Sequence, residues 1–269
     1  MPLTIGSYNL HNVAVSRMQE KLRVAEVIND TKHNFDIVAL QEVTSEATLE
    51  ALVRKLGRDW THGQLGKTPG QGKGLGFVWR SSRVKLHSGH LGCFRKNEYL
   101  WPDRAGVFTR APFITTFEYR ANTLTLINLH LDDGRADFDT KKAAEFAYLC
   151  LKVYEAALPK KPASYCIALG DYNLLLRDIE NRISPDIANT NMVTVQRDKT
   201  TFSKNTADGM LNDLDHFTFN AEREGAIVRS ATAIPAHKDY CEGESIQAKI
   251  AQYRDEFSDH LPVKLVLDL

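Results

Sequence analysis

The segment CIALGDYN (Cys166–Asn173) joins a short apolar run directly to a glycine, an acid and an amide. The run over residues 165–169 is short and rich in β-prone residues, which is typical of a buried strand. Glycine, aspartate and asparagine at its end are on their own most often turn residues. Polar residues at the ends of buried strands are, however, also where loops on a rigid scaffold carry function. The same arrangement recurs at other predicted strands of this chain.

Apolar β-prone runs alternate with helical patterns along the sequence. Strands are predicted over residues 3–8, 36–40, 75–79, 84–87, 113–119, 124–129, 165–169, 214–219, 227–234 and 263–267. Helices are predicted over 18–28, over 49–56 with Gly57 as a cap, and over 141–158, where Pro159 and Pro162 end the last one. The strands between 75 and 129 are too closely spaced for helices between them and therefore indicate antiparallel pairing. We predict a single α/β domain, residues 1–269, with layered sheets.

Composition narrows the class of protein. The chain has 269 residues, of which 43% are hydrophobic and 25% are charged. It contains 34 basic and 34 acidic residues, so the overall charge indicates neither a basic nucleic-acid-binding protein nor a membrane-surface module. A local basic groove stays open as an alternative. The four cysteines form no CxxC pair, which argues against a zinc or redox motif. The first residues resemble no targeting signal, and no run is long enough to span a bilayer, so we expect a monomeric cytoplasmic protein.

Polar side chains stand at the ends of most predicted strands. Each has an ordinary explanation of its own: Glu42 as the N-cap of the next helix, His130 as a hydrogen-bonded histidine, and the SDH triplet as an Asx-turn. If the strands share sheets, however, their ends meet at one rim, and the joint occurrence favours a functional cleft. The residues are Asn9 in SYNLHN, Glu42 in VALQEV, His130 in LINLHL, Asp171 and Asn173 in CIALGDYN, Asp215 in LNDLDHF, and Asp259 and His260 in FSDHLPV.

These motifs carry a family resemblance. SYNLHN, LQEV, FTRAPF, NLHL, GDYN, NDLDHF and SDHLPV, in this order, resemble the endonuclease/exonuclease/phosphatase superfamily, which includes deoxyribonuclease I, AP endonucleases, sphingomyelinases and inositol polyphosphate phosphatases. The resemblance extends from Ile5 to Leu267. It implies a four-layer α/β/β/α sandwich, in which two mixed sheets pack face to face with helices outside. It also implies a divalent-metal-dependent attack of water on a phosphate ester.

The resemblance implies a metal site built from oxygen ligands. Glu42 would be the principal Mg²⁺ ligand, with Asn9 and Asp259 near the metal. Carboxylate and amide oxygens suit Mg²⁺, and Mn²⁺ is a possible replacement. Cysteine and histidine ligands would instead have indicated zinc.

The remaining motif residues are expected to do the chemistry. Charge that grows on the phosphoryl oxygens needs a cation and hydrogen-bond donors, for which Asn173, a protonated His130 and the planar guanidinium of Arg110 are candidates. His260, oriented by Asp215, is expected to activate the attacking water. Asp171 either positions the nucleophile or assists the leaving oxygen. Whether His130 is an acid or an electrostatic clamp also stays open.

One stretch departs from the pattern of deoxyribonuclease I. Secreted relatives of that kind carry an acid just ahead of the strand that corresponds to LGFVWR, where it supports the first histidine. Here that stretch is GQGKGLG, with Lys73 and glycines, and the disulfides of those relatives are not evident. His130 is therefore expected to lack its usual carboxylate partner unless another segment of the chain supplies one, whereas the metal site is unaffected.

Loops decide the substrate. The basic loops 66–74 and 95–104 are candidates for holding DNA phosphates and stacking bases, although the second is equally explained as a packed cover over a sheet edge, with Leu100 and Trp101 in a small core. His11 is either a phosphate contact or a solvated histidine. We expect a Mg²⁺-dependent endonuclease acting on DNA, without a membrane partner. The alternatives are a phosphatase or phospholipase C-like hydrolase of an inositol phosphate or sphingolipid, and a non-catalytic binding module. Against the first alternative, the WxDRI motif of the inositol enzymes is absent.

Overall fold

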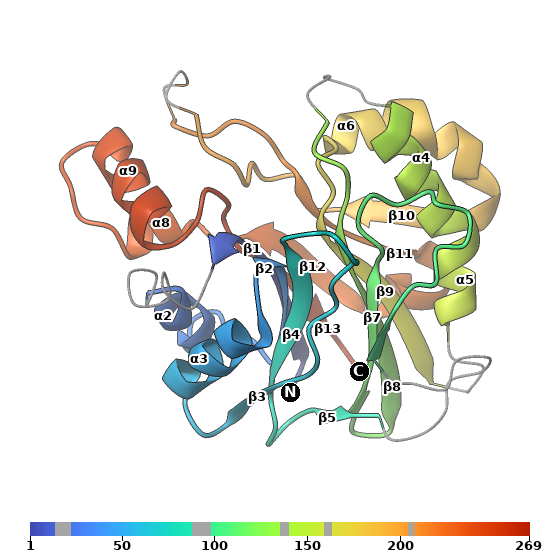
Figure 1. Cartoon of the computed structure of the whole chain (residues 1–269), viewed down its shortest axis with the longest axis horizontal. Coiled ribbons are helices and arrows are strands. Elements are labelled where there is room, and N and C mark those ends of the chain that lie inside the picture. The colour runs from blue at the N-terminus through green and yellow to red at the C-terminus, as the bar shows by residue number, and fades with distance from the viewer. Residues whose placement is uncertain (14–22, 88–97, 135–139, 159–162, 204–205, 207) are drawn as a thin grey trace.

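The computed structural model describes residues 1–13, 23–87, 98–134, 140–158, 163–203, 206 and 208–269. Two sheets pack face to face in the middle of the molecule, with helices on both outer sides (Figure 1). This confirms the predicted α/β sandwich with four layers. The termini lie close together, since the Arg120 guanidinium donates to the carbonyl oxygens of both Met1 and Leu269.

Both sheets are mixed. The first has the order β12 (Val228–Ala233), β13 (Val263–Leu267), β1 (Leu3–Val13), β2 (Ile37–Val43), β4 (Gly74–Arg80) and β3 (Trp60–His62), and its β1–β2 pair is parallel. The second has the order β10 (Met192–Val195), β11 (Asp215–Asn220), β9 (Ser164–Asp171), β8 (Asn122–His130), β7 (Phe113–Tyr119) and β5 (Lys85–Leu86). Its β8–β9 pair is parallel, and β6 (Glu98–Leu100) also pairs with β7.

Helices form the two outer layers. The first sheet is covered by α2 (Val24–Asn29), α3 (Glu46–Leu56), α8 (Ala236–Asp239) and α9 (Ile246–Glu256). The second is covered by α4 (Thr140–Tyr148), η1 (Leu149–Val153), α5 (Tyr154–Ala157), α6 (Leu176–Asp178), η2 (Ile179–Ile183) and η3 (Ser184–Thr190). The short α7 (Ala221–Glu224) and η4 (Gly225–Ile227) link β11 to β12. Within the described residues, no helix combines the length and the apolar composition that crossing a bilayer requires.

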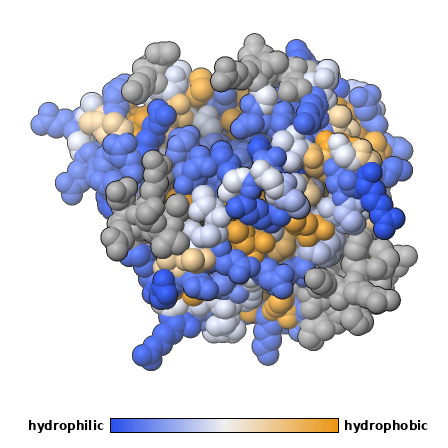
Figure 2. Space-filling model, in the orientation of Figure 1, coloured by the Kyte–Doolittle hydropathy of each residue, from blue (hydrophilic) through white to orange (hydrophobic). Residues whose placement is uncertain are grey.

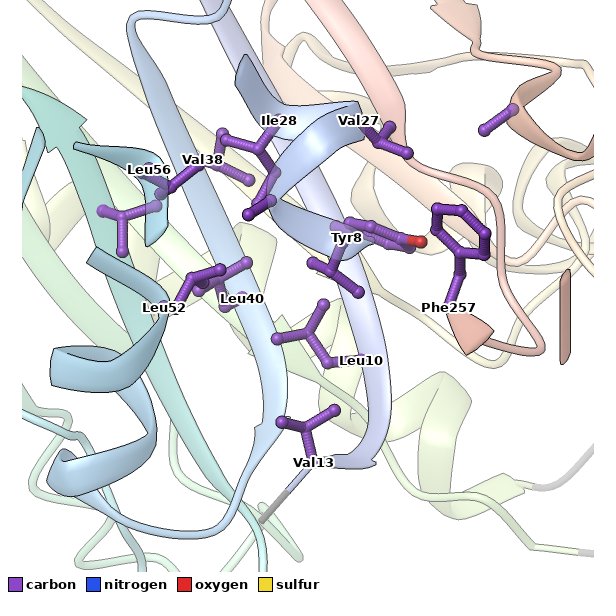
Figure 3. Close-up of a cluster of buried hydrophobic side chains, with 14 of the residues drawn as sticks. Tyr8, Leu10, Val13, Val27, Ile28, Val38, Leu40, Leu52, Leu56 and Phe257 are labelled. Atoms are coloured by element: carbon purple, nitrogen blue, oxygen red, sulfur yellow. The ribbon is translucent and has the colours of Figure 1, made fainter. Parts of the chain in front are cut away.

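Three apolar cores separate these layers, and strand alternation decides which residue enters which core. Along β1, Leu3 and Ile5 point between the sheets, whereas Tyr8 and Leu10 point toward the helices (Figure 3). Phe257, from the turn after α9, packs in that outer core. Full burial of an apolar side chain of this size contributes about 1.5–3 kcal/mol, so the alternation strongly fixes the register of β1.

Several predicted elements differ in extent from the observed ones. The helix predicted over 18–28 is α2 in its described part, while Met18 and Leu22 lie outside the described residues. The helix predicted over 141–158 spans α4, η1 and α5, with a π-helical turn in its middle. The strand predicted over 84–87 is reduced to Lys85–Leu86. The patterns did not predict β3, β6, β10 or α9.

The described part of the second basic loop, from Glu98 onward, covers a sheet edge. Leu100 pairs with Phe113, and the Trp101 amide donates to the Pro112 carbonyl at 2.8 Å. Tyr99 and Trp101 pack against the core under α4. Tyr99 and Trp101 therefore belong to a packed cover over the sheet edge, which was the alternative to a base-stacking role in the sequence analysis. Arg95 and Lys96 lie outside the described residues, as does Cys93, and the other three cysteines are buried and free.

Candidate active site

Five strands bring the predicted polar residues together at one rim of the sandwich. β8 and β9 end there, β11 begins there, and β1 and β2 have register shifts there. Asn9, His130 and Asp215 occupy the positions that continue the inter-sheet faces of β1, β8 and β11. In the strand registers, Asp171 of β9 is paired with His130 on one side and with Asp215 on the other. Strand order thus makes neighbours of side chains far apart in the sequence, at the rim where the predicted strand ends were expected to meet.

Gly170 allows β9 to end in this way. Its φ of 147° is a conformation that L side chains rarely adopt, and a Cβ added there would lie 2.1 Å from the Leu129 carbonyl oxygen. Only glycine avoids this overlap with the neighbouring strand. The close approach of β8 and β9 at Gly170 sets the positions of His130 and Asp171 just beyond it.

Glu42 reaches the rim through a backbone irregularity. Val38 and Leu40 of β2 point toward the helices, so plain alternation would send Glu42 the same way. The register of β2 against β4 shifts between Leu40 and Val43, and Glu42 adopts a left-handed φ of 60°. Asn9 Nδ2 consequently lies 3.5 Å from Glu42 Oε1. A strained φ at a non-glycine residue is often associated with a functional position.

His260 lies between two carboxylates. Its Nδ1 is 2.8 Å from Asp215 Oδ2, and its Nε2 is 3.7 Å from Asp171 Oδ2. Burial alone would lower the pKa of His260, but the charges of Asp215 and Asp171 outweigh it and raise the pKa to about 10. Both carboxylates therefore favour the imidazolium form of this ring. To act as the predicted base, it must first lose this proton.

Asp171 is the centre of the arrangement. Its Oδ2 accepts from Asn9 Nδ2 at 3.0 Å, and its Oδ1 accepts from the backbone N–H of Asn173 at 3.0 Å. Burial raises the pKa of Asp171 to about 6, against the opposing charge of His260. An aspartate in this environment is close to its titration point near neutral pH, which is a common property of groups that handle protons.

His130 is neutral rather than protonated. Its Nε2 is 3.8 Å from Glu42 Oε1 and 3.7 Å from Asp171 Oδ2. Burial holds the pKa of His130 well below its usual value, and the charges of Arg110, Lys73 and His260 lower it further. The direction of this shift disfavours the protonated form that was expected for His130. Its Nδ1 has no hydrogen-bond partner among the described residues, in line with the missing acid ahead of β4.

Arg110 and Asn173 hold the chain that follows β8. Arg110 donates from Nε to the His130 carbonyl at 2.9 Å and from Nη2 to the Leu131 carbonyl at 2.6 Å. Asn173 Nδ2 donates to the same Leu131 carbonyl at 3.1 Å. The guanidinium fork that was expected to face two phosphate oxygens thus has two of its donors on backbone carbonyls. Arg110 fixes the position of His130 in this state.

His11 contacts Asp259, and Ser258 joins the same C-terminal segment to β1. Asp259 Oδ2 lies 2.9 Å from His11 Nδ1. Burial opposes ionisation, but the His11 hydrogen bond and the charge of His260 lower the pKa of Asp259 to about 2. Ser258 Oγ donates to the Asn9 carbonyl at 2.6 Å and accepts from the His260 amide at 3.1 Å. The small polar residue of the SDH triplet therefore joins β1 to the C-terminal segment.

Oxygen atoms suited to a hard divalent cation are present at this rim. Glu42 Oε2 and Asp259 Oδ1 are both buried and have no hydrogen-bond partner in the described part of the chain. Buried unpaired carboxylate oxygens are costly unless a cation or water satisfies them. The unpaired oxygens of Glu42 and Asp259 therefore fit a hard divalent cation, whereas Asn9 Oδ1 already accepts from the His11 amide at 3.0 Å. A second cluster, formed by Asp171, Asp215 and His260, could also hold an ion, but His260 is hydrogen-bonded to Asp215 at 2.8 Å and forms a histidine–carboxylate relay with it, while Asp171 Oδ2 lies 3.7 Å from its Nε2.

Two features of the site were not predicted. The Lys73 ammonium lies 2.8 Å from Glu42 Oε1, in the stretch where an acid was expected. Beneath the rim, Gln41 Nε2 donates to Ser7 Oγ and to Asn128 Oδ1, and Asn128 donates to two backbone carbonyls. Polar residues at inward-facing strand positions, such as Ser7 and Asn128, were the available signal for this layer.

A cleft of about 470 Å³ adjoins the site at Asn173. Three basic residues line it, namely Lys142, Arg177 and Arg182, and Asp178 is the single acid in its lining. Lys142 is only 5% exposed, and its Nζ lies 3.4 Å from the Gly134 carbonyl. The cleft therefore carries net positive charge next to the catalytic candidates.

Comparison with known proteins establishes the family. Residues 6–260 match the model of the endonuclease/exonuclease/phosphatase family, and the chain belongs to this family, whose members are hydrolases of phosphoester bonds. The sequence matches no curated protein significantly.

Similar folds occur in solved structures. TDP2 from D. rerio complexed with single-strand DNA product has a TM-score of 0.67 and 16% identity, with 100% of this chain and 99% of that chain covered. A mannosyl-6-phosphatase from Bacteroides thetaiotaomicron has a TM-score of 0.67 and 17% identity, with 99% and 100% covered. At these identities the likeness shows the fold.

Proposed function

We propose that this protein is a Mg²⁺-dependent phosphodiesterase that hydrolyses DNA. The observation that carries the proposal is the buried arrangement in which His260 lies between Asp215 and Asp171, with His130 and Glu42 across the same rim. Phosphoester hydrolysis needs a proton acceptor for water and charge stabilisation for the phosphoryl group, and this arrangement offers both.

The groups have distinct proposed roles. Once neutral, His260 accepts a proton from water at Nε2, while Asp215 holds Nδ1 and stabilises the imidazolium that forms. Asp171, within 3.7 Å of both histidine rings, positions the attacking water. His130 donates to a phosphoryl oxygen as a neutral imidazole. Asn173 offers a further donor, while Arg110 keeps His130 in place through the His130 and Leu131 carbonyls.

Glu42, Asn9 and Asp259 would hold the divalent cation. When bound, such a cation neutralises charge on the phosphoryl oxygens and polarises the ester. The buried unpaired oxygens of Glu42 and Asp259 support this assignment. Mn²⁺, which also accepts oxygen ligands, is expected to substitute.

DNA is the favoured substrate because the cleft next to the site is lined by basic residues, which can bind the phosphates on either side of the scissile bond. A strand that presents its phosphate at His130 can extend into the cleft lined by Lys142, Arg177 and Arg182.

A lipid substrate is disfavoured by the surface. Hydrophilic residues cover much of the face in Figure 2. Among the described residues, the only large apolar side chains that are extensively exposed are Met1, Leu151, Val193 and Leu211.

A phosphomonoesterase is the second candidate, because the same cleft could accept a small phosphorylated molecule. The mannosyl-6-phosphatase with a similar fold acts, by its name, on such an ester. The test compares two measurements in Mg²⁺: cleavage of end-labelled single-stranded and duplex oligonucleotides, and release of inorganic phosphate from sugar and inositol phosphates. Cleavage of oligonucleotides that is lost in His260→Ala supports the proposal. Phosphate release from the small esters without oligonucleotide cleavage would replace it with the second candidate.

A further inference from the structure

We infer that Lys73 is an exchangeable counter-ion of Glu42: its ammonium competes with the divalent cation for this carboxylate and, once displaced, turns to the phosphate of the substrate. The inference rests on the proposed metal site and deepens it. It assigns a role to a residue that stands where the deoxyribonuclease I pattern has an acid.

The contacts of Glu42 carry the first step. Three polar side chains converge on its Oε1: Lys73 Nζ lies at 2.8 Å, Asn9 Nδ2 at 3.5 Å and His130 Nε2 at 3.8 Å. Oε2 is buried and has no partner among the described residues. Lys73 is thus the group that neutralises a carboxylate whose side chain is only 8% exposed. A cation that binds Glu42 must replace this interaction or share the carboxylate with it.

The position of Lys73 makes exchange possible. Its side chain is 30% exposed, so the ammonium can be rehydrated when it leaves at little cost. Gly72 and Gly74 flank it, and a Cβ added at Gly72 would meet no described atom within 4 Å. The backbone on that side of Lys73 is therefore not confined by packing. An ammonium on a four-carbon stem is a compact point charge that can change partners without a fixed geometry.

The surroundings indicate where the displaced ammonium goes. Lys73, Glu42 and His130 lie together at the rim, and Lys73 is one of the charges that keep His130 neutral. The proposed phosphate position is beside His130. A cation that leaves Glu42 therefore stays next to an anionic group of the substrate, and charge attraction favours that new partner.

Calorimetric titration of the purified protein with Mn²⁺ tests the competition without relying on catalysis. Lys73→Met keeps the length of the side chain and removes its charge, and it is expected to tighten Mn²⁺ binding about fivefold, the size expected for a partly exposed ion pair. Lys73→Arg keeps the charge and should bind Mn²⁺ within about twofold of the unmodified protein. Lys67→Met is the matched control in the same loop, since Lys67 contacts the Thr44 carbonyl rather than a carboxylate. It should leave Mn²⁺ affinity unchanged.

The outcomes separate the inference from the proposed function. If Mn²⁺ binding does not weaken in Glu42→Gln, the metal site itself is wrong. If Glu42→Gln loses binding but Lys73→Met binds no more tightly than the unmodified protein, the competition is wrong while the site stands. At saturating Mg²⁺, Lys73→Met should raise KM for an oligonucleotide several-fold and change kcat less. An unchanged KM would overturn the phosphate contact.

Discussion

Gly170→Ala is expected to destabilise the protein because the added methyl would overlap the backbone of the neighbouring strand. The new Cβ would lie 2.1 Å from the Leu129 oxygen, 2.8 Å from its carbonyl carbon and 2.9 Å from its nitrogen. Contacts this short require the β8–β9 pair to separate, and backbone atoms cannot move aside as a flexible side chain can. Overpacking of this kind costs about 1–3 kcal/mol, and the φ of 147° adds about 1–3 kcal/mol for a residue with a Cβ.

The expected loss is therefore about 4 kcal/mol, which for a chain of this size lowers the melting temperature by roughly 8–16 °C. Gly225→Ala is the matched control, because Gly225 has helical backbone angles and an added Cβ would meet no described atom within 4 Å. It should change stability by less than about 1 kcal/mol, in the stabilising direction. Thermal and urea unfolding followed by circular dichroism measures both variants. A Gly170→Ala protein that melts within 2 °C of the unmodified one, a tolerance of about 1 kcal/mol, would refute the reasoning.

Three further predictions concern the relay, a buried histidine and the basic cleft. His260→Asn should lower kcat by about 10² or more, whereas Asp215→Asn should cause a smaller loss and a shifted pH profile. The double variant should lose far less than the product of the two effects, because the residues act as one unit. Independent, multiplicative losses in steady-state kinetics in Mg²⁺ would contradict the relay. Burial lowers the pKa of His237 to about 4, so the unfolded chain takes up a proton at higher pH than the folded one. The contribution of His237 to the unfolding free energy should thus fall by about 1–2 kcal/mol between pH 7 and pH 5. Urea titrations should therefore show that the unmodified protein loses more stability over this range than His237→Phe does. Arg177→Gln combined with Arg182→Gln should weaken oligonucleotide binding and reduce its dependence on salt concentration, whereas an unchanged salt dependence would remove the cleft from the substrate path.

The rim of the site could be predicted because the polar residues stand at the ends of apolar runs. Once the runs before Asn9, His130 and Asp171 were recognised as strands, strands that share a sheet were expected to bring their ends to one rim, and the order of motifs indicated the family. The structure adds the parallel pairing of β8 and β9, which makes His130 and Asp171 neighbours.

Interactions over long sequence separations could not be predicted in this way. Only Ile250 and Tyr253 of α9 are buried, so its sequence lacks the apolar stripe that is typical of a helix. Ser245 at its N-cap was the one available signal. The hydroxyl of Tyr253 lies 2.7 Å from that of Tyr8, a contact across 245 positions. The Lys73–Glu42 pair and the turned φ of Glu42 likewise depend on how β2 and β4 meet. Secondary-structure propensity and residue spacing do not predict contacts between segments so far apart in the sequence.

Metal-dependent nicking of supercoiled plasmid tests the central claim most directly. The unmodified protein, Glu42→Gln and His260→Ala would be compared in Mg²⁺ and in EDTA, after unfolding measurements confirm that each protein is folded. We expect nicking by the unmodified protein in Mg²⁺, none in EDTA, and a loss of about 10² or more in each variant. Nicking that persists at the unmodified rate in EDTA, or in folded Glu42→Gln and His260→Ala, would contradict the account.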